Sequence, residues 1–229
     1  MTGAGSDRVV AITGATGRLG GVVAATFAEA GYRLALMAQS RADCEDLAST
    51  LPGGLDRHMG LGVDLSSAEA SAAAATEDRE RLGSVSGLLQ LVGGYAGGRP
   101  FVENDDIEMK NLLALNLWTT VHAVRAFLPD IAAAVHGRIV TVSTFVAAAP
   151  TPKHAAYAAS KAAVEALTIS VARDLAGTTA TSNVVVIRSI GDEKPADTRP
   201  EEIAAAMLWL CSPEGGATNG QRVLLHGRA

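Results

Sequence analysis

The 229-residue chain has only two cysteines, and aromatic residues make up just 4% of it. Cys44 and Cys211 stand alone, without a CxxC or metal-ligand pattern, so we expect two reduced thiols and no metal site. Hydrophobic residues nevertheless reach 48% of the chain. The core must therefore be built mainly from aliphatic side chains.

The chain also lacks long hydrophobic runs and an excess of positive charge. No run approaches the roughly 18 to 20 apolar residues that a membrane-spanning helix needs. Met1 to Arg8 lacks the basic and apolar regions of a secretory signal, so we expect a cytoplasmic protein. A formal charge of −5, without a basic stripe and interleaved aromatics, argues against a nucleic-acid partner.

Short apolar runs rich in β-formers alternate with longer segments of helical spacing, which predicts parallel strands joined by right-handed crossovers. We expect strands at residues 8–13, 33–38, 59–63, 87–92, 138–143, 184–187 and 222–226. We expect helices at residues 18–30, 41–51, 66–82, 104–134 (with a break), 154–176 and 200–212. No linker divides the chain. The sequence predicts one domain over 1–229, an α/β doubly wound Rossmann fold whose seven-stranded parallel sheet carries helices on both faces.

A glycine-rich turn follows the first expected strand and leads into the first helix. Glycines there let the backbone turn tightly and approach a pyrophosphate, whose charge would face the free N–H groups of the helix. The alternative is a purely structural turn. The residues expected to bind the cofactor are Gly14, Thr16, Gly17, Arg18, Leu19 and Gly20.

Three residues bear on which dinucleotide binds. The second strand is not followed by the carboxylate that selects NAD, whereas Ser40 and Arg41 offer a hydroxyl and a positive charge that suit a 2′-phosphate. We therefore expect NADP(H) in preference to NAD(H). The alternative is that Arg41 is only a surface residue of the next helix. Asp64, after the third strand, is expected either to accept a hydrogen bond from adenine or to cap the following helix.

Tyr157 and Lys161 lie four residues apart near the start of an expected helix, which places them on one face. A phenol ionises near ~10 and is a poor base at neutral pH, so a nearby ammonium would help by favouring the phenolate. The pair suits proton transfer.

These residues resemble the short-chain dehydrogenase/reductase family, which shares the YxxxK pattern, a glycine motif after a Thr, and an Asn in the central helix, here Asn116. The likeness extends to Asn219-Gly220-Gln221 before the last strand. It implies that Tyr157 transfers a proton, Lys161 lowers the pKa of that tyrosine and binds the nicotinamide ribose, and Asn116 holds a relay water.

The family also uses a hydroxyl that polarises the substrate oxygen. Its usual spacing before the tyrosine falls on Thr144, and Ser143 is one residue earlier. Adjacent strand residues face opposite ways, so only one is expected to point into the site. We favour Thr144, and a small bulge would substitute Ser143.

The chain departs from the family in three places. Arg18 occupies a position where many members have glycine. Gln90-Leu91-Val92-Gly93 replaces an Asn-Asn-Ala-Gly segment. The replacement is expected to remove polar groups that steady the central strand and the cofactor. Cofactor binding would then depend on backbone contacts, as at Gly93. The segment Arg188 to Arg199 is much shorter than usual and is expected to be a solvated loop that leaves the site open.

The segment from Gly93 to Gly98 is similar to one in dihydropteridine reductases, which would imply a pterin substrate. Alternatively, Tyr95 packs against its own loop. His154, one turn before Tyr157, is expected to border the pocket.

The sequence thus predicts hydride transfer between NADP(H) and a small-molecule carbonyl or alcohol. One alternative is a non-catalytic dinucleotide-binding redox sensor, although such proteins generally lack the tyrosine and the lysine. Another is an isomerase or lyase that uses its cofactor transiently. The resemblance implies a homodimer or homotetramer formed through helices 104–134 and 154–176.

Overall fold

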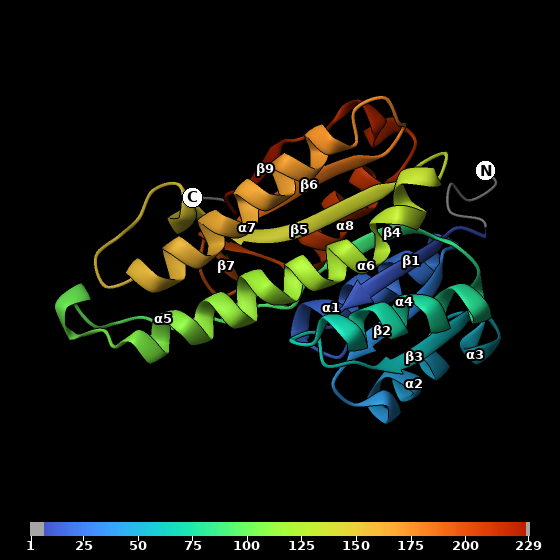
Figure 1. The fold of residues 1–229 in the computed structure, drawn as a ribbon, viewed down its shortest axis with the longest axis horizontal. Helices are drawn as coiled ribbons and strands as arrows, with labels where there is room; N and C mark the ends of the chain where they lie inside the picture. Colours follow the sequence, from blue (N-terminus) through green and yellow to red (C-terminus); the bar gives the residue numbers. More distant parts are fainter. Residues whose placement is uncertain (1–6, 228–229) are drawn as a thin grey trace.

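The computed structural model describes residues 7–227, and the expectation about a leader at residues 1–6 lies outside them (Figure 1). Its centre is a seven-stranded sheet in the order β3-β2-β1-β4-β5-β6-β9, and every neighbouring pair is parallel. The strands are β1 (Val9–Thr13), β2 (Arg33–Ala38), β3 (His58–Gly62), β4 (Val85–Gln90), β5 (Arg138–Thr144), β6 (Thr181–Ile187) and β9 (Arg222–Leu225). The predicted fold class is confirmed.

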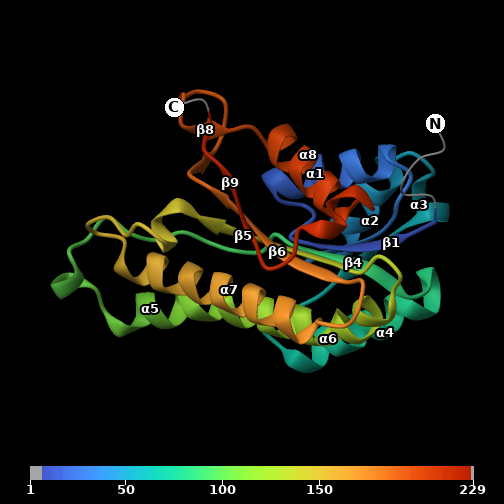
Figure 2. The same ribbon diagram turned by 90° about the horizontal axis from the view of Figure 1, so that it is seen from above.

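Helices cover both faces of the sheet (Figure 2). One face carries α1 (Arg18–Glu29), α2 (Arg41–Thr50) and α8 (Pro200–Cys211), and the other carries α4 (Ala68–Leu82), α6 (Thr119–Ala133) and α7 (Ala155–Asp174). Each face has its own core of buried, mostly aliphatic side chains. The short helices α3 (Gly54–Arg57) and α5 (Asp106–Leu112) were not predicted as separate elements.

Strand β6 begins three residues earlier than predicted because its first residues are polar, and two of them, Ser182 and Asn183, find hydrogen-bond partners inside the protein. The Ser182 hydroxyl donates to the Thr168 carbonyl at 2.9 Å, and the Asn183 amide oxygen accepts from the Gln221 backbone at 3.0 Å. A search for apolar runs misses a strand whose polar side chains have buried partners.

The long central helix, for which the sequence left a break open without placing it, departs from regular α-helix at one segment. Helix α5 passes into a π-helical segment, Leu113–Trp118, which continues directly as α6. Such π-helical turns are frequent at functional sites, because they redirect side chains out of the regular helical register. This one contains Asn116.

The shortened segment after β6 is more ordered than the predicted solvated loop. Two short parallel strands, β7 (Ser189–Ile190) and β8 (Asp197–Thr198), pair with each other. Asp197 is buried, accepting hydrogen bonds from the Ser189 hydroxyl and the Lys194 backbone, and the Thr198 hydroxyl donates to the Leu225 carbonyl at 3.1 Å. Residues 192–195 are exposed, as expected of a solvated loop, but the pairing of β7 with β8 and the buried Asp197 carboxylate give the segment an order that the sequence did not predict.

Candidate active site

The glycine-rich turn lies at the carboxyl end of β1, between β2 and β4, where the strand order changes direction and α/β proteins commonly bind their ligands. Gly14 has φ +65°, and a side chain at Gly20 would collide with the Gly14 carbonyl oxygen. Gly17 precedes the first turn of α1 and supplies no side-chain cap, and the residues on either side of it, Thr16 and Arg18, are exposed. This turn fits a pyrophosphate.

The ends of β1 and β4 are joined by a buried polar network that the sequence did not predict. The Thr13 hydroxyl donates to the Gln90 side-chain oxygen at 2.7 Å and accepts from the Leu91 backbone at 3.0 Å. The Gln90 amide also donates to the Thr119 hydroxyl at 3.3 Å. Gln90 therefore supplies the polar support expected to be lost, and the prediction of a weakened central strand was wrong.

A cavity of about 540 Å³ beyond the ends of β2 and β3 is placed to receive the adenosine half of a dinucleotide. It is lined by Gln39 and Asp64, among others, but not by Arg41. The Asp64 carboxylate accepts from the Ser66 backbone and hydroxyl at 2.9 and 2.6 Å, which lowers its pKa. The helix cap of α4 is Ser67 instead, so the capping alternative for Asp64 was wrong.

Ser40 and Arg41 do not point together toward a 2′-phosphate. The Ser40 hydroxyl caps α2 by accepting from the Asp43 backbone at 3.2 Å. Arg41 forms an ion pair with Glu77 of α4 at 2.9 Å. The local sequence does not reveal this partner, because Glu77 is 36 residues away.

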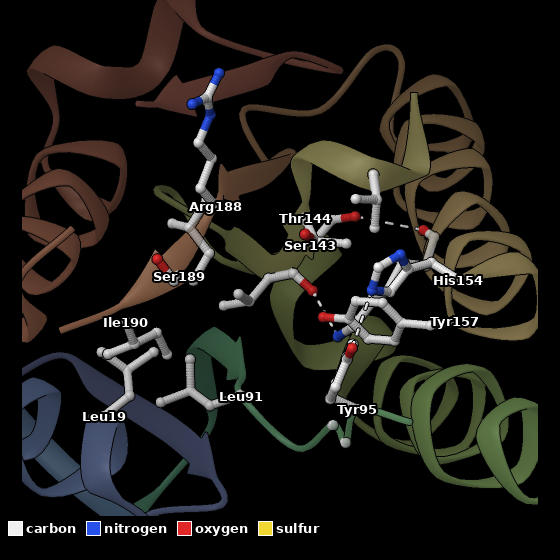
Figure 3. Close-up of a pocket in the computed structure, with 16 residues that line it drawn as sticks. Leu19, Leu91, Tyr95, Ser143, Thr144, His154, Tyr157, Arg188, Ser189 and Ile190 are labelled. Carbon is white, nitrogen blue, oxygen red and sulfur yellow. Dashed lines mark hydrogen bonds between the residues drawn. The ribbon is translucent and has the colours of Figure 1, made fainter. Parts of the chain in front are cut away.

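A second cavity, of about 500 Å³, opens between the carboxyl ends of the central strands and the start of α7 (Figure 3). Tyr157 and Lys161 both line it, one helical turn apart on α7, as their spacing predicted. Leu19 and Gly93 reach it from the cofactor turn and the segment after β4. The expected catalytic and nicotinamide-binding residues therefore meet at one cavity.

Lys161 is almost completely buried, and its ammonium donates to the Val142 carbonyl at 3.1 Å. Burial lowers its pKa to about 8, and the opposing effect of the Glu165 carboxylate is smaller. A lysine with this pKa still carries its charge at neutral pH.

Asn116 is buried between the segment after β4 and α7. Its side-chain oxygen accepts from the Gly94 backbone at 2.8 Å, and its amide donates to the Ser160 hydroxyl at 2.9 Å and to the Gly94 carbonyl at 3.1 Å. A Cβ at Gly93 would lie 2.8 Å from the Lys161 ammonium and 2.9 Å from the Asn116 oxygen. A larger residue at Gly93 would therefore crowd both polar groups.

Burial raises the pKa of the Tyr157 phenol, and a hydrogen bond from Thr144 opposes this rise. The sequence predicted the opposite direction, through the charge of Lys161. The difference arises because burial removes water from both groups, which disfavours the phenolate and the ammonium alike.

Ser143 and Thr144 both line the cavity, contrary to the expectation that only one would. The alternation ends here because β5 stops at Thr144 and a 3₁₀ turn, Phe145–Ala147, follows. Their partners differ. The Thr144 hydroxyl interacts with the Tyr157 phenol, whereas that of Ser143 points to the Lys161 carbonyl at 3.5 Å.

Tyr95 and His154 form a polar pair beside Tyr157 at the cavity mouth (Figure 3). The Tyr95 hydroxyl lies 3.0 Å from His154 Nε2, and Thr151 lies 2.9 Å from the other ring nitrogen. The Tyr95 ring meets that of Tyr157 edge-on, with centroids 5.0 Å apart. Tyr95 thus contacts the site instead of packing only on its loop, and His154 borders the cavity as expected.

Comparison with known proteins agrees with this geometry. A family model described as short chain dehydrogenase matches residues 8–191. The chain belongs to the short-chain dehydrogenase family. It is therefore an NAD(P)-dependent oxidoreductase.

Relatives and solved structures span most of the chain. A 2,3-dihydroxy-2,3-dihydro-p-cumate dehydrogenase of Pseudomonas putida is 30% identical over 80% of this chain and 78% of its own length. A short-chain dehydrogenase/reductase from Brucella melitensis superposes with a TM-score of 0.89 at 27% identity, covering 99% of this chain and 98% of its own.

An NADPH-bound short-chain oxidoreductase from Pseudomonas aeruginosa PAO1, described as having an atypical catalytic centre, superposes with a TM-score of 0.87 at 25% identity. The alignment covers 96% of each chain. None of these three is described as a dihydropteridine reductase, so the likeness of the Gly93–Gly98 segment remains a local one.

No helix within residues 7–227 is long and apolar enough to cross a membrane. Nor do three or more His, Cys, Asp or Glu side chains of the described part gather in a way that would hold a metal ion.

Proposed function

We propose that the protein transfers hydride between NADP(H) and the carbonyl or alcohol group of a small molecule. The observation that carries this proposal is that Tyr157, Thr144 and Lys161 line one cavity, with Tyr157 and Lys161 one turn apart on α7. NADP(H) is proposed over NAD(H) because no carboxylate follows β2 to bond a ribose 2′-hydroxyl and repel a 2′-phosphate.

The chain's own residues divide the work between binding and proton transfer. The glycine-rich turn would hold the pyrophosphate, and Lys161 and Gly93 would face the nicotinamide ribose. The bound dinucleotide supplies or accepts the hydride. Tyr157 gives its phenolic proton to the substrate oxygen in reduction and takes it back in oxidation, while Thr144 orients that oxygen by hydrogen bonding.

The raised pKa of Tyr157 suits the reductive direction. A phenol that stays protonated at neutral pH is ready to act as a general acid, whereas oxidation requires it to lose that proton first. We therefore propose that carbonyl reduction is the faster direction at neutral pH.

The cavity walls favour a substrate with a hydrocarbon body. Its apolar lining comes from both faces of the site and comprises Leu19, Leu91, Val142, Val146, Ile187 and Ile190. We propose a carbonyl or alcohol whose reacting group faces Tyr157 while its carbon skeleton contacts these side chains.

The deciding experiment screens aldehydes, ketones and alcohols with NADPH and NADH, or their oxidised forms, while following the nicotinamide absorbance. The expected result is a stoichiometric change with at least one compound, lost in Tyr157→Phe. Binding of cofactor without turnover of any compound, together with capture of a protein partner that depends on redox state, would favour the sensor alternative. Product formation without net change in nicotinamide absorbance would favour an isomerase or lyase.

We further propose assembly as a homodimer or homotetramer through the central helix and α7, and a cytoplasmic location. Large apolar side chains on this part of the surface remain exposed, with Trp118 at 51% and Leu115 at 42%. Light scattering at micromolar concentration is expected to give at least twice the chain mass, and a monomeric mass would refute assembly.

A further inference from the structure

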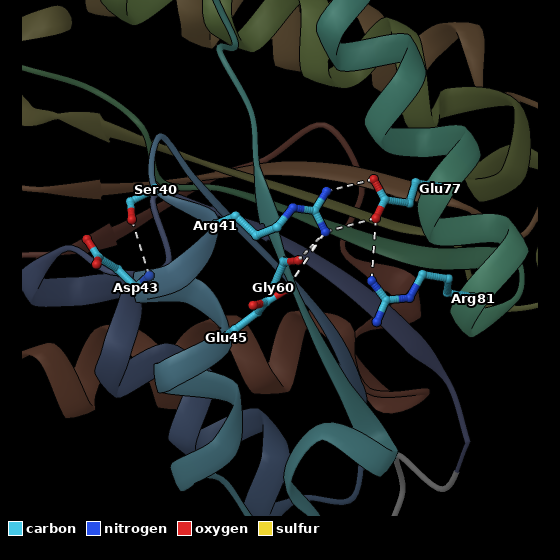
Figure 4. Close-up of polar contacts among 7 residues, drawn as sticks. All are labelled: Ser40, Arg41, Asp43, Glu45, Gly60, Glu77 and Arg81. Carbon is cyan, nitrogen blue, oxygen red and sulfur yellow. Dashed lines mark hydrogen bonds and ion pairs between the residues drawn. The ribbon is translucent and has the colours of Figure 1, made fainter.

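Arg41, the one cation expected to read a 2′-phosphate, is held by a carboxylate on another helix (Figure 4). Its Nη1 and Nη2 atoms donate to the two carboxylate oxygens of Glu77 at 3.0 and 2.9 Å. Nη1 also reaches the Gly60 carbonyl at 3.3 Å and lies 3.9 Å from Glu45. Both ends of the guanidinium fork are therefore engaged within the protein.

This arrangement aims the arginine away from the adenosine cavity. Figure 4 shows Arg41 extending from the start of α2 toward α4, while Ser40 turns to the other side, toward Asp43. The cavity itself is lined by Gln39 and Asp64 and not by Arg41. In its present position, the guanidinium contributes charge but no direct contact to that cavity.

The charges around Arg41 do not attract an anion on their own. Arg41 contacts the carboxylates of Glu45 and Glu77, and together with Arg81 this cluster carries two positive and two negative charges. Arg81 is itself directed to Glu77, at 3.4 Å. A 2′-phosphate would therefore have to take Arg41 from Glu77 before the arginine could favour its binding.

We propose that Glu77 is a selectivity residue for the dinucleotide, because it competes with the 2′-phosphate of NADP(H) for the guanidinium of Arg41. This inference rests on the proposed function, in that it assumes a nicotinamide dinucleotide in the cavity. Glu77 touches no part of the reacting centre. It acts by positioning Arg41, and it narrows the difference between the affinities for NADPH and NADH.

The exposure of the pair makes such an exchange feasible. The side chains of Arg41 and Glu77 are 42% and 37% exposed, so water and salt weaken their attraction, and breaking it costs little. A phosphate offers the same forked geometry with more negative charge. After the exchange, Glu77 retains Arg81 as a partner.

The test compares Glu77→Gln, which keeps the shape and removes the charge, with Glu80→Gln on an exposed turn of the same helix. Dissociation constants for NADPH and NADH are measured by fluorescence titration at low salt. Glu77→Gln is expected to tighten NADPH about three- to fivefold, the upper part of the scale of an exposed ion pair, and to leave NADH within about twofold. Glu80→Gln is expected to change neither by more than about twofold.

A second variant shows whether the effect passes through Arg41. In Arg41→Ala/Glu77→Gln the tightening of NADPH is expected to disappear relative to Arg41→Ala alone. The same titrations with 2′,5′-ADP and 5′-AMP remove the nicotinamide from the comparison, and only the 2′-phosphorylated ligand should respond.

The outcomes separate this inference from the proposed function. If the unmodified protein binds neither dinucleotide, the proposed function itself is wrong. If it binds both but Glu77→Gln leaves the ratio of the two constants unchanged, or changes it equally without Arg41, Glu77 is not a selectivity residue. An equal response in Glu80→Gln would assign the effect to general charge and overturn the inference as well.

Discussion

The two ends of the cofactor region differ in how they hold their charged groups. At the nicotinamide end, Lys161 and Asn116 are buried, and each is hydrogen-bonded to the backbone. At the adenosine end, Arg41 and Glu77 are exposed and held mainly by one another. The first arrangement leaves each group one position, whereas the second allows partners to exchange.

The two ends also differ in what shifts the pKa values of their groups. Burial is the main cause at the nicotinamide end, and pairing with an opposite charge is the main cause at the adenosine end. Lys161 and Tyr157 lose water on burial, which favours the neutral form of each: the pKa of Lys161 is lowered and that of Tyr157 is raised. At the exposed end the charged form is favoured instead: the hydrogen bond from Arg41 lowers the pKa of Glu77. The comparison predicts large effects for substitutions at the buried end and small, salt-dependent effects at the exposed end.

The largest effect is expected for Tyr157→Phe, which removes the proton donor but keeps the ring against Tyr95. Turnover should fall by about 10² or more, the scale of general acid catalysis, while the dissociation constant for NADPH stays nearly unchanged. Steady-state kinetics and titration of the same sample measure both. Turnover at the unmodified rate would remove Tyr157 from the mechanism.

Thr144→Ala and Ser143→Ala form a matched pair that sharpens the description of the buried end. Only Thr144 interacts with the phenol, so its loss is expected to lower kcat by about 10², whereas Ser143→Ala should stay within a few-fold. Because losing the Thr144 hydrogen bond also raises the pKa of Tyr157, the pH profile for oxidation should move to higher pH in Thr144→Ala alone. The reverse ranking would make Ser143 the catalytic hydroxyl.

Asp78 is an exception to the contrast between a buried nicotinamide end and an exposed adenosine end. It follows Glu77 on α4, but it is fully buried and has no hydrogen-bond partner among the described residues. Burial, with a contribution from Asp130, raises its pKa from 3.8 to about 7. The folded state therefore keeps a proton that the unfolded chain has lost, and the stability from this proton disappears as pH rises through 7.

The expected consequence for Asp78→Asn is a gain in the free energy of unfolding that is about 2 kcal/mol larger at pH 8 than at pH 5. Urea denaturation of both proteins at the two pH values measures this difference. An equal effect of the substitution at both pH values would show that Asp78 does not titrate with a raised pKa.

A smaller effect than that of Tyr157→Phe is expected for Lys161→Met, because the buried ammonium is proposed to bind the cofactor and does not itself give the proton to the substrate. Affinity for NADPH and turnover should each fall about tenfold, the value of one hydrogen bond to a charged group. Circular dichroism controls for folding. Unchanged affinity in a folded variant would show that the ammonium does not bind the nicotinamide ribose.

Much of the site could be predicted because its signals are local. The four-residue spacing of Tyr157 and Lys161, the glycines after β1 and the Asn in the central helix each lie within one element and its immediate flank. The strand Thr181–Ile187 was predicted only from residue 184, since the buried Ser182 and Asn183 have their hydrogen-bond partners outside the strand. The ordered segment around Asp197 was missed because a charged run looks solvated when its hydrogen bonds are unknown.

The sequence by itself determined the fold class and the position of the proton-transferring pair, because strand and helix periodicity and helical spacing are properties of contiguous residues. Only the tertiary structure decided which partners the polar groups have: Gln90 with Thr13, Thr144 with Tyr157, and Arg41 with Glu77. It also decided the direction in which the pKa of Tyr157 moves. Burial and long-range pairing depend on elements far apart in the chain, and no local pattern records which of them will meet.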